Sequence, residues 1–218
     1  MKLSEKTKAI LTNFGAINQS MLIVAGNRQR TMNIPSKSIL ADATLDETFP
    51  IDFGIYKLDK FLQLLSLFSD PDLDFGDKFV TFSEGVNKAT FTYYEAKLIK
   101  APPKGVDIPF KNPVVSFELT NEVFNKLQKA GKILSNQDLV LEADGENMFF
   151  TVKNNKDSSA DTFVEILGPS TETFKYGFDI DVLKFIPSNY DVVIADNNMS
   201  KFSSKDMNLT YWLPTQKA

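Results

Sequence analysis

The chain has 218 residues, of which 43% are hydrophobic, 12% are aromatic and 24% are charged, and its formal net charge at pH 7 is -4. These values are typical of globular proteins and exclude a disordered chain, while the length allows one large domain or two domains of about 100 residues each. The absence of Cys and His excludes disulfide bonds, a thiol nucleophile, a Cys-based zinc site and a histidine general base.

Several motifs that would indicate a bound ligand, secretion or membrane insertion are also missing. Neither the phosphate-binding pattern G-x-x-x-x-G-K-[ST] nor the dinucleotide-binding pattern G-x-G-x-x-G occurs, so the sequence predicts no cofactor. The acidic segment SDPDLDFGD, residues 69–77, lacks the spacing of a calcium loop, and we expect a solvated turn after a helix there. The N-terminus lacks the apolar core of a signal peptide, and no stretch reaches the roughly 18 apolar residues of a membrane span. A soluble, intracellular protein is therefore expected.

The first half of the chain alternates between helical and strand-like segments. Residues 4–15 place Ile10, Leu11 and Phe14 on one helical stripe, with Ser4 as a candidate N-cap. Residues 56–68 show a second helical stripe. Segments rich in β-branched and aromatic residues predict strands at 21–26, 28–34, 38–43, 49–55, 78–83 and 87–94.

A proline-rich segment separates the two halves. Four of the ten prolines lie between residues 102 and 113, where they remove backbone donors and disfavour helices and central strands. We therefore expect a first domain at residues 1–101, a connector at 102–113 and a second domain at 114–218. Residues 1–110 carry 13 basic and 13 acidic residues, and residues 111–218 carry 11 and 15, so neither half is basic overall.

The second half repeats the order of the first. A helix is predicted at 121–134 after Thr120 as N-cap, and a short helix at 179–187 that Pro187 closes. Strands are predicted at 114–119, 139–143, 147–153, 161–167, 173–178, 191–195 and 209–213. The repeated order indicates an internal duplication, and we predict an α+β fold of two similar domains, each with two helices on antiparallel sheet.

Every predicted helix carries lysine on its polar side. In the helix at 121–134, Lys126, Lys129 and Lys132 form a strip opposite Phe124 and Leu127. On a single helix such a strip is ordinarily a solvated face. Repetition on four helices, with Lys6, Lys8, Lys57, Lys60 and Lys184 on the other three, favours a surface that attracts phosphates without reading bases.

Three segments resemble a known family. MKLSEKTKAILTNFGAIN (1–18) and DFGIYKLDKFLQLLSLF (52–68) are similar to segments of the sliding clamps of T4-like bacteriophages, the processivity factors of the phage DNA polymerase. IPFKNPVVSFELTNEVFNKLQKAGKI (108–133) resembles the connector and the third helix of that family. The similarity is strong in the first third of the chain, fair through 108–133 and poor toward the C-terminus.

The resemblance implies the DNA-clamp fold and no enzymatic activity or cofactor. It implies a homotrimeric ring with sheets outside and helices around a hole for duplex DNA, loading by an ATP-dependent clamp loader, and tethering of the replicative DNA polymerase. Support of late transcription and a location in the cytoplasm of the infected bacterial host follow from the same resemblance. It implies that the DNA-facing residues are Lys6, Lys8, Lys57, Lys60, Lys126, Lys129, Lys132 and Lys184. It places a partner-peptide pocket at Val106, Ile108, Pro109, Phe110, Tyr211, Trp212, Leu213 and Pro214.

Two other classes of protein stay open from the residues alone. A β-rich structural or adaptor protein of a virion would carry the same lysines as solvated faces and would stimulate no polymerase. A carboxylate-based hydrolase would need two carboxylates that converge in a deep pocket, and no spacing in the sequence demands such a pair. Trp212, the only Trp, is equally consistent with plain strand packing.

Overall fold

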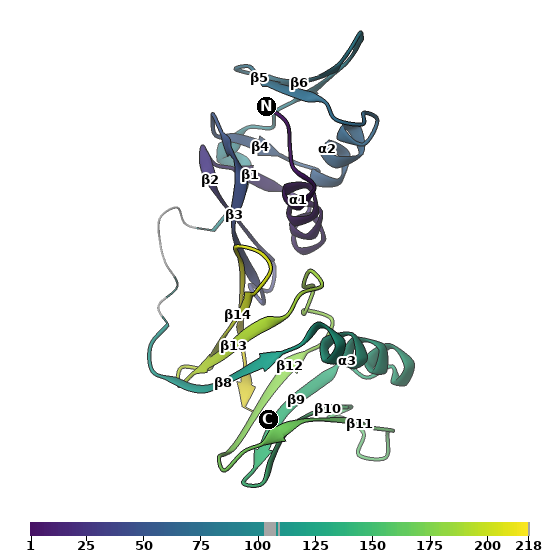
Figure 1. Ribbon diagram of the computed structural model, residues 1–218, viewed down its shortest axis with the longest axis vertical. Helices are drawn as coiled ribbons and strands as arrows, with labels where there is room; N and C mark the ends of the chain where they lie inside the picture. Colours follow the sequence, from purple (N-terminus) through teal and green to yellow (C-terminus); the bar gives the residue numbers. More distant parts are fainter. Residues whose placement is uncertain (103–107, 109, 218) are drawn as a thin grey trace. The chain divides into compact units, whose positions relative to one another are not determined.

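The computed structural model describes residues 1–102, 108 and 110–217, and these fall into two compact units (Figure 1). Unit 1 comprises Met1–Asp107 together with two short segments from later in the chain, Lys184–Ile186 and Asn208–Tyr211. Unit 2 comprises Ile108–Leu183, Pro187–Met207 and Trp212–Ala218. The boundaries predicted from the prolines did not include Lys184–Ile186 and Asn208–Tyr211 in the first domain.

The described residues of unit 1 combine short antiparallel sheets with two α-helices. Its helices are α1 (Glu5–Ile17), α2 (Leu58–Leu65) and the 3-10 helix η1 (Ala96–Leu98). Its strands are β1 (Met21–Ile23), β2 (Gly26–Met32), β3 (Leu40–Phe49), β4 (Phe53–Ile55), β5 (Asp72–Phe75), β6 (Phe79–Glu84) and β7 (Asn87–Thr92). Antiparallel pairs join β1 to β4 and β2 to β3, and β6 lies between β5 and β7.

Both α-helices of unit 1 bury an apolar stripe, and α1 also has a side-chain cap at its start. The hydroxyl of Ser4 accepts a hydrogen bond from the Thr7 amide at 3.1 Å, which satisfies one of the free N–H groups at the start of α1. The stripe that contains Leu11 and Phe14 is buried, so the prediction of this helix is confirmed. Helix α2 is shorter than predicted, because Lys57 is still extended and Ser66 already caps the C-terminal end.

Aromatic rings fill the core of unit 1 between its sheets. Phe49 and Phe75 meet edge to face with ring centroids 5.7 Å apart, and Phe53 stacks on Tyr93 at 4.5 Å. Burying one Phe side chain contributes about 1.5–3 kcal/mol. Strands β4 and β5 have only a few residues each, so these ring contacts add to their short ladders in holding them in place.

The acidic segment 69–77 begins as the predicted solvated turn after a helix, since Ser69 and Asp70 are exposed in the bend that follows α2, but its middle is a strand. Asp72–Phe75 forms β5, in which Leu73 is buried while Asp72 and Asp74 are exposed. Alternation of acidic and apolar residues is the pattern of a strand with one solvated face. The chain terminus adds to this edge, because the Leu73 amide donates to the Met1 carbonyl at 2.7 Å and the Met1 ammonium donates to the Leu73 carbonyl at 2.9 Å.

Unit 2 is built from longer antiparallel strands and one α-helix among its described residues. Helix α3 spans Asn121–Leu134. The strands are β8 (Pro113–Leu119), β9 (Asp138–Asp144), β10 (Asn147–Lys153), β11 (Phe163–Pro169), β12 (Thr173–Asp179), β13 (Tyr190–Ala195), β14 (Met199–Ser204), β15 (Leu209–Pro214) and β16 (Gln216–Lys217). One sheet has the order β11-β10-β9-β12-β16, and β13 lies between β8 and β14. Strand β15 begins in unit 1 and ends in unit 2.

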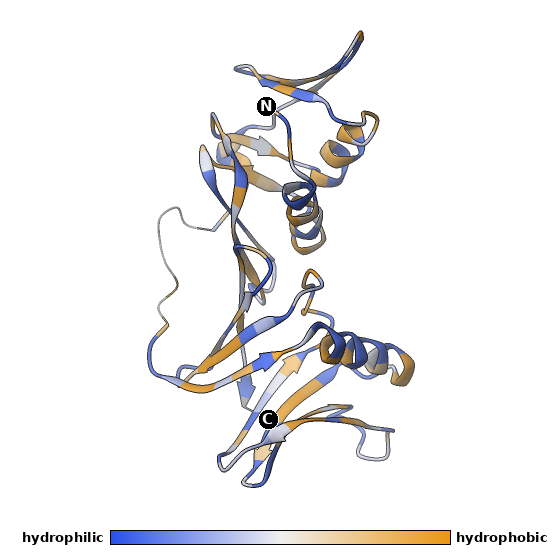
Figure 2. Cartoon of the chain, viewed as in Figure 1, coloured by the Kyte–Doolittle hydropathy of each residue, from blue (hydrophilic) through white to orange (hydrophobic). Residues whose placement is uncertain are grey.

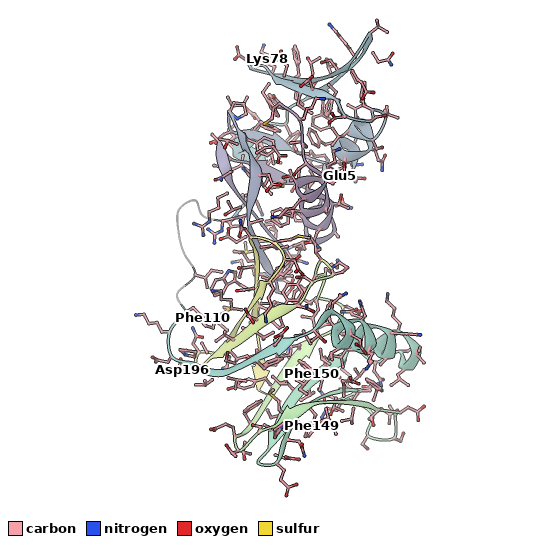
Figure 3. The ribbon with its side chains drawn as sticks, viewed as in Figure 1. Glu5, Lys78, Phe110, Phe149, Phe150 and Asp196 are labelled. Carbon is pink, nitrogen blue, oxygen red and sulfur yellow. The ribbon has the colours of Figure 1, made fainter. Side chains whose placement is uncertain are left out.

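Side chains alternate across the sheet of unit 2, as a pleated strand requires. Phe150 on β10 is 1% exposed and packs edge to face on Phe117 of β8, with centroids 5.9 Å apart. Its neighbour Phe149 points to the opposite face (Figure 3). The α+β class with antiparallel sheets is thereby confirmed, and Figure 2 shows polar and apolar residues alternating around α3.

The predicted helix at residues 179–187 is wrong. Strand β12 runs to Asp179, and a turn follows in which the Val182 amide donates to the Asp179 carbonyl at 3.1 Å. Phe185 stacks on the distant Tyr211 with ring centroids 4.4 Å apart, and Pro187 disfavours helical backbone at the residue before it. Unit 2 therefore has one α-helix among its described residues instead of the predicted two.

Candidate nucleic-acid interface and partner sites

The lysine row predicted for α3 forms one exposed stripe of unit 2. Thr120 fixes the start of the helix, because its hydroxyl accepts from the Val123 amide at 3.3 Å. The helix buries its opposite side, at Phe124, Leu127 and Gly131. The exposed stripe consists of Lys126, Lys129 and Lys132. A phosphate approaching this side of α3 meets three ammonium groups, with the exposed Ile133 beside them.

The three lysines of the stripe differ in their partners. The ammonium of Lys126 lies 3.2 Å from a carboxylate oxygen of Glu122, one helical turn earlier, and 3.2 Å from one of Glu165 on β11. Two hydrogen bonds raise the pKa of Lys126, and the bond to Glu122 contributes more than the bond to Glu165. Among the described residues, neither Lys129 nor Lys132 has an ion-pair partner.

The lysines of unit 1 divide in the same way. Lys57 and Lys60, at the start of α2, are exposed and form no ion pair with a described residue. On α1, Lys8 pairs with Glu5 at 2.8 Å, and Lys6 lies 3.9 Å from a carboxylate oxygen of Asp46 on β3. Both α1 lysines are half-buried.

Lys184 lies at the C-terminal end of α1. Its ammonium donates to the Ala16 carbonyl at 3.0 Å, and the Asn13 side-chain amide donates to the Lys184 carbonyl at 2.7 Å. A cation at this end of a helix is stabilised by the free carbonyl groups and the helix dipole. The structure thus brings Lys184 to α1, although the helix predicted to carry it is absent.

Unit 2 has an open apolar groove beside an edge strand. Strand β11 is the outer strand of its sheet, so its backbone groups on the outer side are free to pair with another strand. A groove of about 510 Å³ separates it from α3. Ile133, Val164 and Ile166 near this edge are 70%, 51% and 65% exposed. The groove is lined by Lys126, Lys129, Ala130, Ile133, Leu134, Thr162, Phe163 and Glu165.

Unit 1 has a cleft of similar size beside its own edge strand. Strand β7 is an outer strand of the sheet β5-β6-β7. The cleft between β7 and α2 has about 570 Å³, and its rim carries the ring pair of Tyr56 and Tyr94, with centroids 5.1 Å apart. Its lining comprises Tyr56, Lys57, Lys60, Leu64, Thr90, Phe91, Thr92, Tyr93 and Tyr94. Each unit therefore presents a helix, an edge strand and a hollow between them.

The predicted partner-peptide pocket is only partly assembled from described residues. Val106 and Pro109 lie outside the described residues, and Ile108 is half-buried. The ring of Phe110, labelled in Figure 3, meets the ring of Trp212 edge to face with centroids 5.4 Å apart. Pro214 is exposed. Phe110 and Trp212 are thus the two predicted pocket residues that the structure brings into contact.

The other two predicted pocket residues point inward. Leu213 is 2% exposed. Tyr211 is fully buried in unit 1, where its hydroxyl donates to Asn13 at 2.8 Å and accepts from the Ile186 amide at 3.1 Å. Its ring stacks on Phe185 at 4.4 Å. The strand alternation of the YWLP segment explains this split, since neighbouring side chains point to opposite faces.

Lys201 joins the aromatic pair, and sequence reasoning missed it. Its ammonium lies 5.3 Å from the centroid of the Trp212 ring, within the range of a cation–π contact. Lys201 is on β14, whose sequence MSKFSS is too rich in Ser and Lys to indicate a strand by composition. Alternation around the buried Phe202 was the signal that could have identified it.

Sequence comparison relates this chain to phage replication proteins. A family model described as DNA polymerase processivity factor matches residues 2–75. The sliding clamp of Vibrio phage KVP40 is 32% identical over 223 aligned positions, which cover 99% of both chains. The chain is a member of the sliding-clamp family. The sliding clamp of Enterobacteria phage T4 is 24% identical and aligns with 95% of this chain and 94% of its own length.

The fold of this sliding clamp is shared with solved clamps of cellular organisms. PCNA from Thermococcus kodakaraensis superimposes with a TM-score of 0.70 over 99% of each chain at 15% identity. The resemblance to the clamps of T4-like phages is therefore confirmed, and DNA and a DNA polymerase are the partner classes of a processivity factor. Within the described residues, no helix is long and apolar enough to cross a membrane and no group of acidic side chains could hold a metal ion.

Proposed function

We propose that this sliding clamp is a non-enzymatic homotrimeric ring that encircles duplex DNA, with its helices around the hole and its sheets outside. The carrying observation is the set of exposed lysines on α2 and α3 that have no ion-pair partner among the described residues, namely Lys57, Lys60, Lys129 and Lys132. Such lysines neutralise phosphates without regard to base sequence. Lys6, Lys8, Lys126 and Lys184 complete the proposed lining. The ring acts in the cytoplasm of the infected bacterial host.

The proposed ring closes through the two edge strands. The β11 edge of one copy pairs with the β7 edge of the next, so that backbone hydrogen bonds continue from sheet to sheet. Exposed Ile133 supplies the apolar contact on one side, and the aromatic cleft with Tyr56 and Phe91 receives it on the other. Because the two surfaces differ, the contact is head to tail, and such contacts close into rings when the rotation allows.

The proposed ring tethers the replicative DNA polymerase through a peptide. The peptide docks on the pair of Phe110 and Trp212, beside the connector at 102–113 that joins domains at 1–101 and 114–218, whereas Tyr211 and Leu213 are buried and support the strand beneath. An ATP-dependent clamp loader places the ring on DNA, and the ring also supports late transcription. The T-shaped ring pair supports this site, because a partly exposed aromatic pair is a typical peptide anchor.

Two measurements test this proposal. The first is the mass of the full chain in solution by light scattering over a range of micromolar concentrations, where we expect three copies. The second is the product length made by the cognate polymerase on primed circular DNA, with loader and ATP, where we expect an increase that depends on the clamp. A chain that stays monomeric throughout and lengthens no product contradicts the proposal.

A further inference from the structure

Lys126 is the first lysine of the α3 stripe, and its charge is already compensated within the chain. Two carboxylates share its ammonium at 3.2 Å each, Glu122 from the same helix and Glu165 from β11. Glu165 is held in place by the strand, since it lies opposite Phe150 in the ladder and its side chain is 19% exposed. Lys126 itself is 48% exposed, so a phosphate can reach it.

Its two neighbours in the stripe are in a different electrostatic state. Lys129 and Lys132 lie one and two helical turns further along and have no carboxylate partner among the described residues. A phosphate that contacts either of them meets a full positive charge. A phosphate that contacts Lys126 also meets two carboxylates. If these do not move away, they repel the phosphate, because all three groups are negatively charged.

We propose that Glu122 and Glu165 attenuate the contact of the α3 stripe with DNA by competing with phosphate for Lys126. This inference rests on the proposed function, because it takes the stripe as the DNA-facing surface. A tether that moves along a duplex needs weak contacts, and a carboxylate that replaces a departing phosphate at the lysine keeps the charge satisfied between steps. Glu122 and Glu165 are positioning residues for the sliding of the clamp.

Lysines paired with carboxylates also occur on α1. Lys8 has Glu5 at 2.8 Å, and Lys6 has Asp46 of β3 at 3.9 Å, while Lys57 and Lys60 of α2 have no partner among the described residues. In each unit, lysines with a carboxylate partner thus accompany lysines without one. The test below therefore compares Lys126 with lysines of unit 2 that are paired with carboxylates outside the stripe.

The test measures binding of the full chain to a 30-base-pair duplex, a probe length that we choose, by fluorescence anisotropy as a function of salt. The test variant is E122Q/E165Q, which keeps side-chain size and frees Lys126. The matched control is E118Q/E142Q, which also raises the net charge by two and breaks two ion pairs of unit 2, Lys205–Glu118 and Lys175–Glu142, both at 2.7 Å. E122Q alone is a second test variant, because Glu122 does not line the groove at the β11 edge.

We expect E122Q/E165Q to bind the duplex about three- to tenfold more tightly than the parent near 50 mM salt. The slope of log K against log salt should be steeper by about 0.9, which is the value for one added phosphate contact. Adding K126Q to this variant should remove the gain. An equal gain in E118Q/E142Q shows that only total charge matters and overturns the inference.

The failure of this inference is separable from failure of the proposed function. If E122Q/E165Q binds as the parent does while K129Q/K132Q weakens binding, the stripe faces DNA and the attenuation is refuted. If K129Q/K132Q changes neither binding nor its salt slope, the DNA-facing assignment itself is wrong. The mass of each variant in solution identifies any change that arises from altered assembly.

Discussion

Replacing Gly54 by Ala should destabilise unit 1 and loosen the β7 cleft. A Cβ atom at Gly54 would lie 2.6 Å from the Tyr94 carbonyl oxygen and 3.0 Å from Cγ1 of Ile99. The first of these atoms belongs to the backbone, so the chain at Tyr94 must move. That movement weakens the hydrogen bond from the Tyr94 amide to the Gly54 carbonyl, now 2.8 Å long.

The size of the effect follows from two contributions. Overpacking of a closely packed site destabilises by about 1–3 kcal/mol. Loss of one backbone hydrogen bond adds about 0.5–1.5 kcal/mol. We expect the free energy of unfolding to fall by about 2–4 kcal/mol, measured by urea denaturation at neutral pH.

Gly15→Ala is the matched control in the same unit. Its nearest foreign atom would be Cδ2 of Leu58 at 3.7 Å, an ordinary contact, and the residue lies inside α1. Ala is favoured over Gly by about 1 kcal/mol in a helix interior, so this variant should be as stable as the parent or more stable. A Gly54→Ala protein with unchanged stability would refute the close approach at Tyr94.

Three further predictions concern single side chains. Tyr211→Phe removes the buried hydroxyl that accepts from the Ile186 amide and donates to Asn13, so it should lower the free energy of unfolding by about 1–3 kcal/mol in urea titrations. Tyr56→Phe at an exposed position should change it by less than about 0.5 kcal/mol. Burial, with a smaller contribution from Asp74, raises the pKa of Tyr93 to about 12. Between about pH 10 and 12 this tyrosine ionises only in the unfolded chain, so stability should fall with rising pH, and melting curves of Tyr93→Phe should show a smaller fall than those of the parent. Ile133→Asp should raise the dissociation constant of the ring about 30-fold in sedimentation experiments, while Leu98→Asp, also at an exposed apolar residue, should leave the mass unchanged.

The success of the sequence predictions depended on how local their causes were. Helix α3 begins and ends as predicted, because Thr120 at its start and the apolar spacing along it both lie within the segment. The segment at 179–187 has helical spacing too, but Phe185 packs on Tyr211, a residue distant in sequence. A contact of that kind overrides the local pattern.

The candidate site shows the same division between local and distant causes. The stripe of Lys126, Lys129 and Lys132 is a property of one helix, so the sequence was sufficient to predict it. The partner Glu165 lies 39 positions from Lys126, and only the fold brings them together. The contact of Lys201 with Trp212 likewise depends on the placement of β14, whose composition did not indicate a strand.

The most direct test of the proposed ring is retention on DNA as a function of its topology. The clamp is loaded with loader and ATP on nicked circular DNA, the complex is isolated by gel filtration, and half of it is linearised with a restriction enzyme. An encircling ring predicts that the clamp stays with the circle and is lost from the linear molecule. Equal retention on both forms, with a strong dependence on salt, would contradict encirclement and indicate ordinary surface binding.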